Sequence, residues 1–229
     1  MISTAGVLLT KNDYAYSQVR FRILTGELPP GAVISQARLA RELGVSTTPL
    51  REAIRRLAAE GMILLEAHRD ARVTTVSAQE ARHLHEVRGS VDPLAAGLAA
   101  ESRTEEQLEQ MGHALRRMTP LRDGTSMDSL LAHRDFHRSV YRASDNAVLV
   151  DILEQLWDKS DRYRLIGLRA SDDSPDDSAR IRAEHEEILA AVEAGDAERA
   201  RQVMRLHVRQ SLGRQAITAL EHPVAQGGA

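Results

Sequence analysis

Residues 39–54 read Leu39-Ala-Arg-Glu-Leu-Gly-Val-Ser-Thr-Thr-Pro-Leu-Arg-Glu-Ala-Ile54, and this stretch decides the fold around it. It predicts a short helix that begins after Ser35, its expected N-cap, and ends before Gly44. A second helix is expected after the N-cap Ser46, and it tolerates Pro49 in its first turn. The apolar face of this second helix carries Leu50, Ile54 and Leu57. Two helices joined by a tight turn form a helix-turn-helix.

A helix precedes this motif and a β-hairpin follows it. Helical apolar spacing ends near Thr25, because the prolines of Leu28-Pro-Pro-Gly31 forbid its continuation. Residues 62–65 and 72–76 are predicted to form two short strands around a polar turn at 66–71. The segment is therefore predicted to be a winged helix-turn-helix with the hairpin as its wing.

The first exposed side chains of the second helix are expected to contact DNA, since this end of the helix enters the major groove in such modules. These side chains are Ser46, Thr47, Thr48 and Arg51. The guanidinium of Arg51 can bind guanine through two hydrogen bonds or pair with a phosphate. Arg38 on the preceding helix, and His68 with Arg69 at the wing tip, are expected to contact the DNA backbone or minor groove.

The formal charge changes sign where the first linker is expected. Residues 1–76 hold ten Lys and Arg against seven Asp and Glu, a charge of +3, whereas residues 77–229 hold 20 against 26, a charge of −6. A basic first segment suits contact with phosphates. We therefore expect two domains with these bounds, the first of which binds DNA.

The sequence lacks cysteine, a membrane-spanning segment and a signal sequence, which limits the metal sites and the location that we expect. Without cysteine the chain forms neither disulfides nor thiolate metal sites, so a metal would need His, Asp or Glu ligands. No apolar run approaches the roughly 20 residues that a membrane span needs, and the N-terminus lacks a basic-then-apolar signal sequence. We expect a cytoplasmic protein without a membrane partner.

Residues 77–229 show helical patterns and almost no strand signal, which predicts a mainly α protein with an all-α antiparallel bundle as its second domain. Helices are expected near 78–91, 93–101, 104–118, 127–143, 146–169, 178–194 and 196–220. The expected breaks are Pro93, Pro120, the acidic segment 171–178 and Gly195.

Four histidines are placed so that they can converge in this bundle. His133 and His137 are four residues apart, on one face of a single predicted helix. His185 and His207 lie on two helices that reverse direction at Gly195, which brings them to similar heights. A single histidine is more often an ordinary core or surface residue than a ligand, so the set matters more than its members.

The first domain resembles the DNA-binding domain of GntR-family regulators. The resemblance is carried by Gly26-Glu-Leu-Pro-Pro-Gly31, by residues 39–54 and by Leu57-Ala-Ala-Glu-Gly61. It implies a winged helix-turn-helix that binds operator DNA; the alternative is a winged helix kept for protein contacts alone. The chain departs from the family at Thr47, where arginine is usual, and at Asp70, where glycine is usual, so the operator sequence and the wing tip do not follow from the family.

The second domain resembles the FadR C-terminal domain, the effector module of one GntR subfamily. The matching positions are Arg88, His133-Arg-Asp-Phe-His137, Asn146, Glu184-His185-Glu-Glu-Ile-Leu-Ala-Ala-Val192 and Met204-Arg-Leu-His207. The resemblance implies that one divalent ion is bound by His133, which stands in an aspartate position, and by His137, His185 and His207. Histidine in place of aspartate removes a negative charge, which favours zinc, with nickel as the alternative, over harder ions. The resemblance also implies Arg88 as the partner of a small carboxylate effector; a structural salt bridge is the other interpretation of Arg88.

These features predict a DNA-binding transcriptional regulator, expected to be a repressor, and not an enzyme. It would bind a palindromic operator as a homodimer and respond to a small organic acid at the metal site. In one alternative the metal is itself the signal. In another the chain is a histidine-ligated metalloenzyme, although no suitably placed general base is evident and a DNA-binding domain would be superfluous. In a third it is a dimerisation protein that does not bind DNA.

Overall fold

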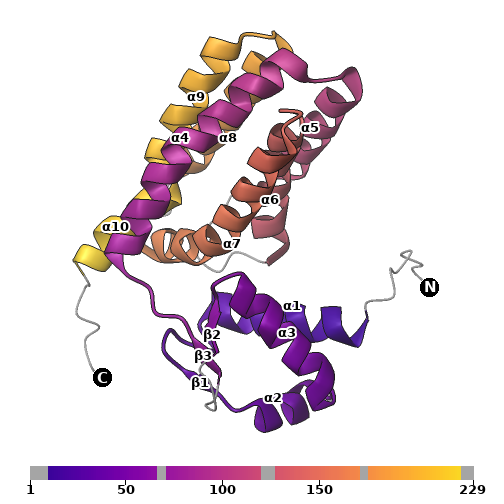
Figure 1. Cartoon of the computed structure of the whole chain (residues 1–229). Coiled ribbons are helices and arrows are strands. Elements are labelled where there is room, and N and C mark those ends of the chain that lie inside the picture. Colours follow the sequence, from indigo (N-terminus) through magenta and orange to yellow (C-terminus); the bar gives the residue numbers. More distant parts are fainter. Residues whose placement is uncertain (1–9, 66–70, 120–126, 171–174, 223–229) are drawn as a thin grey trace. The chain divides into compact units, whose positions relative to one another are not determined.

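The computed structural model describes residues 10–65, 71–119, 127–170 and 175–222. The chain divides into two compact units, Met1–Val76 and Ser77–Ala229. Each unit has its own hydrophobic core. Figure 1 labels the elements of both units.

The first unit is a winged helix-turn-helix, as the sequence predicts. Its elements are α1 (Lys11–Thr25), β1 (Val33–Ile34), α2 (Gln36–Leu43), α3 (Thr47–Ala59), β2 (Ile63–Leu64) and β3 (Ala71–Val73). The strands form an antiparallel sheet in the order β1-β3-β2, in which Arg72 pairs with both Val33 and Leu64. The two hairpin strands, β2 and β3, are shorter than predicted. The sequence did not predict β1, because two residues between a proline-rich turn and a helix carry no strand pattern.

The turn between α2 and α3 follows from Gly44. Its φ of 66° and ψ of 28° lie in the left-handed region, which glycine adopts without the steric cost of a Cβ atom. Ser35 and Ser46 occupy the N-cap positions of α2 and α3, but neither side chain makes the capping hydrogen bond. The predicted apolar face of α3 is confirmed: Leu50, Ile54 and Leu57 are buried in the core of this unit.

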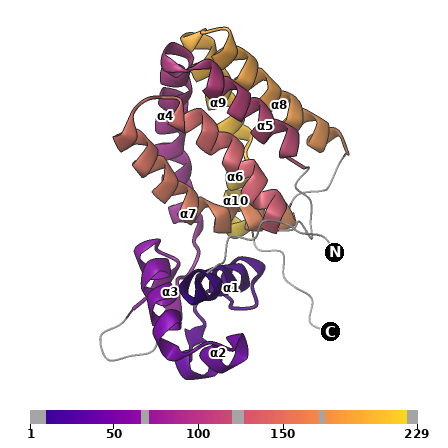
Figure 2. The same cartoon turned by 90° about the vertical axis from the view of Figure 1, so that its right-hand side faces the viewer.

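The second unit is an all-α bundle, as the sequence predicts. Its helices are α4 (Ala78–Ser102), α5 (Glu105–Arg117), α6 (Met127–Arg142), α7 (Ala147–Ala170), α8 (Pro175–Glu193), α9 (Ala197–Gln210) and α10 (Leu212–Glu221). The long helix α4 packs along α9, while α10 packs on α7 and α4 (Figures 1 and 2). Within the described ranges, no helix is both long and apolar enough to cross a membrane.

Two predicted helix boundaries are wrong. Pro93 does not end a helix, since α4 runs through it to Ser102. Its missing hydrogen bond is outweighed by packing, because this part of α4 buries an alanine-rich face. The predicted helix 196–220 is divided at Ser211, whose ψ of 160° is extended, so that α9 and α10 pack against different neighbours.

Candidate metal centre

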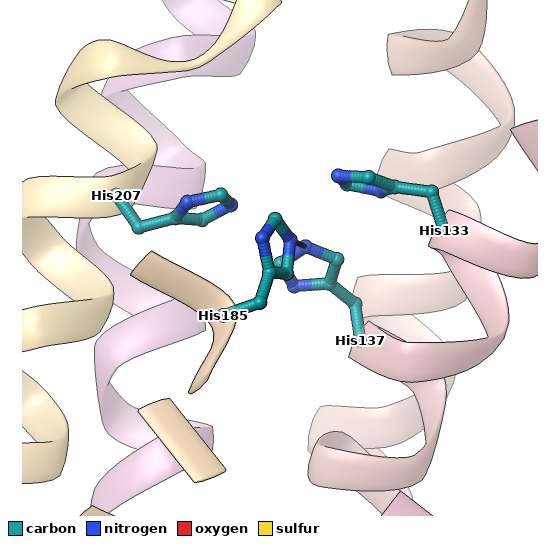
Figure 3. A group of neighbouring side chains, drawn as sticks. All are labelled: His133, His137, His185 and His207. Carbon is teal, nitrogen blue, oxygen red and sulfur yellow. Dashed lines mark hydrogen bonds between the residues drawn. The ribbon is translucent and has the colours of Figure 1, made fainter. Parts of the chain in front are cut away.

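Four histidines from three helices point their rings into one space inside the bundle (Figure 3). His133 and His137 come from α6, His185 from α8 and His207 from α9. One nitrogen of each ring lies within 4.8 Å of the others, and the Nε2 atoms of His137 and His185 are 3.2 Å apart. Four nitrogens bound tetrahedrally to one zinc ion at about 2.1 Å are about 3.4 Å apart. A small inward movement is therefore sufficient for all four rings to bind one ion.

Burial favours the neutral, metal-binding form of three of these imidazoles. None of the four residues is more than 7% exposed. Burial, followed by the charges of nearby basic groups, lowers the pKa of His133, His137 and His185 well below the usual value of 6.5. Each of these three rings therefore presents a lone pair at neutral pH.

Hydrogen bonds on the far side of two rings hold them for metal binding. The Nδ1 of His185 donates to the carbonyl of Ile181 over 2.6 Å, which leaves Nε2 free to face the cluster. The Nδ1 of His207 lies 2.9 Å from a carboxylate oxygen of Glu184. Burial would raise the pKa of Glu184, but its hydrogen bond with His207 and the nearby Arg180 lower it, so this side chain is a carboxylate. Such outer partners orient the ring and increase the basicity of the ligand.

The other two rings have buried polar atoms without protein partners. The Nδ1 atoms of His133 and His137 make no hydrogen bond within the described part of the chain. Buried nitrogens without partners are costly, and a bound ion or water would satisfy them. The donor set therefore fits a divalent ion of borderline softness, such as zinc or nickel. Asp135 lies outside this cluster and pairs with Arg138 over 3.1 Å.

A small cavity adjoins the cluster, and Arg88 lines it. About 30 Å³ of this cavity is open to water-sized groups. The guanidinium of Arg88 lies 2.6 Å from the carboxylate of Asp92 and 4.4 Å from the ring of Trp157. Asp92 also accepts a hydrogen bond from Tyr141 over 3.0 Å. In this structure Arg88 thus makes the structural salt bridge that was the alternative interpretation.

Sequence reasoning missed a second arginine of the same cavity. Arg164 on α7 is 4% exposed, and its guanidinium lies 4.6 Å from the ring of Trp157. Burial lowers the pKa of Arg164 to about 10, so the group is still charged at neutral pH. No local motif marks Arg164, because its position depends on how α7 packs in the bundle. Glu184, by contrast, could have been predicted as an outer partner of the cluster, since it directly precedes the predicted ligand His185.

The residues predicted to contact DNA lie at the surface of the first unit. Ser46, Thr47, Thr48 and Arg51 are exposed at the start of α3. Arg38 on α2 is 76% exposed and pairs with Glu42 over 2.8 Å. His68 and Arg69, like Asp70, lie outside the described residues. Arg55 is exposed one turn after Arg51 and pairs with Glu52 over 2.7 Å.

Comparisons with known families match both units. The profile of bacterial regulatory proteins of the gntR family matches residues 11–73, and the FCD domain profile matches residues 83–210. The chain belongs to the GntR family. It is a regulator with an N-terminal GntR helix-turn-helix and a C-terminal FCD domain, which is the FadR C-terminal type of domain.

Individual relatives of this GntR regulator agree with the family match. A probable D-xylose utilization operon transcriptional repressor of Paenarthrobacter nicotinovorans is 32% identical over 204 residues, covering 87% of this chain and 88% of the relative. The HTH-type transcriptional repressor GlaR of Escherichia coli is 26% identical over 198 residues, covering 84% and 90%. The structure of McbR/YncC from Escherichia coli superposes with a TM-score of 0.72 at 23% identity, covering 89% of this chain and 95% of that one, which shows the same fold.

These relatives decide between the function classes. They are transcriptional regulators, so the chain is a DNA-binding transcriptional regulator of the GntR family and not an enzyme. The metalloenzyme alternative is thereby excluded.

Proposed function

We propose that this GntR regulator represses transcription from a near-palindromic operator as a homodimer, and that a small carboxylate bound beside a zinc or nickel ion changes its affinity for DNA. The observation that carries the proposal is the convergence of four buried imidazoles on one point beside a cavity. An allosteric coupling of about 1–3 kcal/mol would change operator affinity about 5- to 150-fold.

The DNA half of the proposal rests on the exposed start of α3. Thr48 and Arg51 are free to enter a major groove, and no described residue pairs with Arg51. Arg38 would exchange its ion pair with Glu42 for a phosphate, at little cost because exposed ion pairs are weak. The homodimer is supported by exposed apolar side chains on the second unit, among which Val148 on α7 is 70% exposed.

The metal as the signal is the second candidate, and the donor set favours it. Four imidazoles are enough to complete the tetrahedral shell of zinc, which is the arrangement of structural zinc sites. An organic acid could then reach the ion only if the coordination number rose, as nickel allows more readily. In this candidate the loaded ion alone fixes the positions of α6, α8 and α9.

Two measurements on the full chain test the metal site and separate the two candidates. Elemental analysis after dialysis is expected to find one ion per chain, and none in the double variant His185→Ala with His207→Ala. The exposed His113 supplies the control His113→Ala, which should keep its ion. One ion per chain in the double variant would contradict the proposed metal site. Operator affinity is then measured with and without zinc, and with and without organic acids: a response to zinc alone identifies the metal as the signal.

A further inference from the structure

Arg164 differs from Arg88 in how its charge is compensated, although both guanidinium groups line the same cavity and lie against the same tryptophan ring. Arg88 holds Asp92 at 2.6 Å, and hydrogen bonds from Trp157 to Tyr141 and from Tyr141 to Asp92 complete a closed chain. The positive charge of Arg88 is therefore already matched by a dedicated carboxylate.

The charge of Arg164 has no such dedicated partner. Its Nη1 reaches Asp161 only at 3.5 Å, and Asp161 lies at the same distance from the guanidinium of Arg134. The Nη2 of Arg164 is buried and makes no hydrogen bond within the described ranges. A buried guanidinium that shares one distant carboxylate and leaves a nitrogen without a partner is poised to bind an added oxyanion.

The metal ligands would not supply the missing negative charge. All four are imidazoles, and burial keeps three of them neutral, so a divalent ion would add two positive charges beside Arg164. An anion placed in the cavity would then face both the ion and Arg164. This step rests on the proposed function, whereas the unpartnered Nη2 of Arg164 does not.

The volume of the cavity limits the size of the anion. About 30 Å³ beside Arg164 takes a group of the size of a carboxylate. A second cavity of about 20 Å³ shares the wall residues Arg88, Val208 and Ser211 with the first. Its other walls include Ser160 and His85, so a short polar extension of the ligand would find hydrogen-bonding groups there.

We propose that Arg164, and not Arg88, binds the anionic group of the effector, and that this effector is a small oxyanion, with a short carboxylic acid bearing a hydroxyl group as the preferred class. Trp157 supplies the readout, because it is the only tryptophan of the chain and both guanidinium groups lie against it. An oxyanion drawn to Arg164 changes the surroundings of this ring and hence its fluorescence.

The experiment titrates the full chain with acetate, glycolate and inorganic phosphate while tryptophan fluorescence is followed. We expect Arg164→Gln to weaken binding about ten-fold or more, the loss of a charge-assisted hydrogen bond, and Arg164→Lys to restore part of it. The matched control is Arg142→Gln, which removes an exposed arginine outside the cavity and should bind as the wild type does. Arg88→Gln with Asp92→Asn removes the neighbouring ion pair without leaving a lone charge, and it should lose less affinity than Arg164→Gln. Stronger binding of glycolate than of phosphate identifies a carboxylic acid, and the reverse order identifies an inorganic oxyanion; both support Arg164 when they depend on it.

Two results would overturn the proposal: equal binding by Arg164→Gln and wild type, or no binding of any of the three anions by the wild type. The titration is repeated on protein stripped with a chelator, and metal content is measured separately. Failure of the metal site appears as missing ions, whereas failure of the present inference appears as binding that does not depend on Arg164.

Discussion

The carboxylate of Glu184 lies 2.9 Å from the Nδ1 of His207. The other nitrogen of this ring is thereby left to face the cluster. This contact fixes which ring nitrogen carries the proton and leaves the other free as a metal ligand. The position of Glu184 directly before His185 means that one segment of α8 supplies both a ligand and the partner of another ligand.

Glu184→Gln is expected to lower zinc affinity about 10-fold, within the range of about 10 to 100-fold seen for such outer partners. The amide keeps a hydrogen-bond acceptor but loses the charge that increases the basicity of the His207 ring. Competition with a chromophoric chelator measures the change. Glu187→Gln is the matched control, because Glu187 is an exposed residue of the same helix. Equal affinities in both variants would contradict the role of Glu184.

The metal-free protein is expected to lose stability as the pH falls below about 6.5. His133, His137 and His185 have lowered pKa values in the folded protein, whereas the same residues in the unfolded chain take up protons near pH 6.5. The unfolded state then binds more protons, so stability is full above pH 6.5 and declines below it.

Thermal unfolding between pH 7.5 and 5.5 checks this dependence. His137→Gln should flatten the decline, while His113→Gln, at an exposed position outside the cluster, should leave it unchanged. A melting temperature that stays constant over this interval would falsify the interpretation of the cluster as neutral imidazoles.

Arg88→Met is expected to destabilise the protein by about 3–5 kcal/mol, because it leaves the buried carboxylate of Asp92 without its cation. Burial would lower the pKa of Arg88, but the adjacent carboxylate raises it, in agreement with a strong pair. The double variant Arg88→Met with Asp92→Leu removes both charges and should lose less stability. Urea denaturation measures both; a double variant as unstable as the single one would argue against this explanation.

Thr48→Ala with Arg51→Ala is expected to weaken binding to the protein's own upstream DNA about ten-fold or more. The change removes a hydroxyl and a guanidinium from the exposed start of α3. Fluorescence anisotropy at fixed salt measures the affinity. Arg116→Ala, an exposed site on α5, is the control for loss of one positive charge. Wild-type affinity in the double variant would show that α3 is not the reading helix.

The first unit could be predicted from its sequence because its signals are local. Gly44 requires a turn, and the spacing of Leu50, Ile54 and Leu57 gives α3 one apolar face. The helix at Pro93 could not be predicted in this way. Its continuity depends on burial against other helices, and a local rule for proline does not include that energy.

The winged helix-turn-helix, the helical second domain and the identities of the four histidines could be predicted from local patterns, because spacing along a helix fixes which side chains share a face. The approach of the four rings to within 4.8 Å of one another depends on how α6, α8 and α9 pack together. The packing of the helices also places Arg88 against Asp92, while one nitrogen of Arg164 has no hydrogen-bond partner among the described residues. The physical reason is that the compensation of a buried charge depends on neighbours that come from several helices.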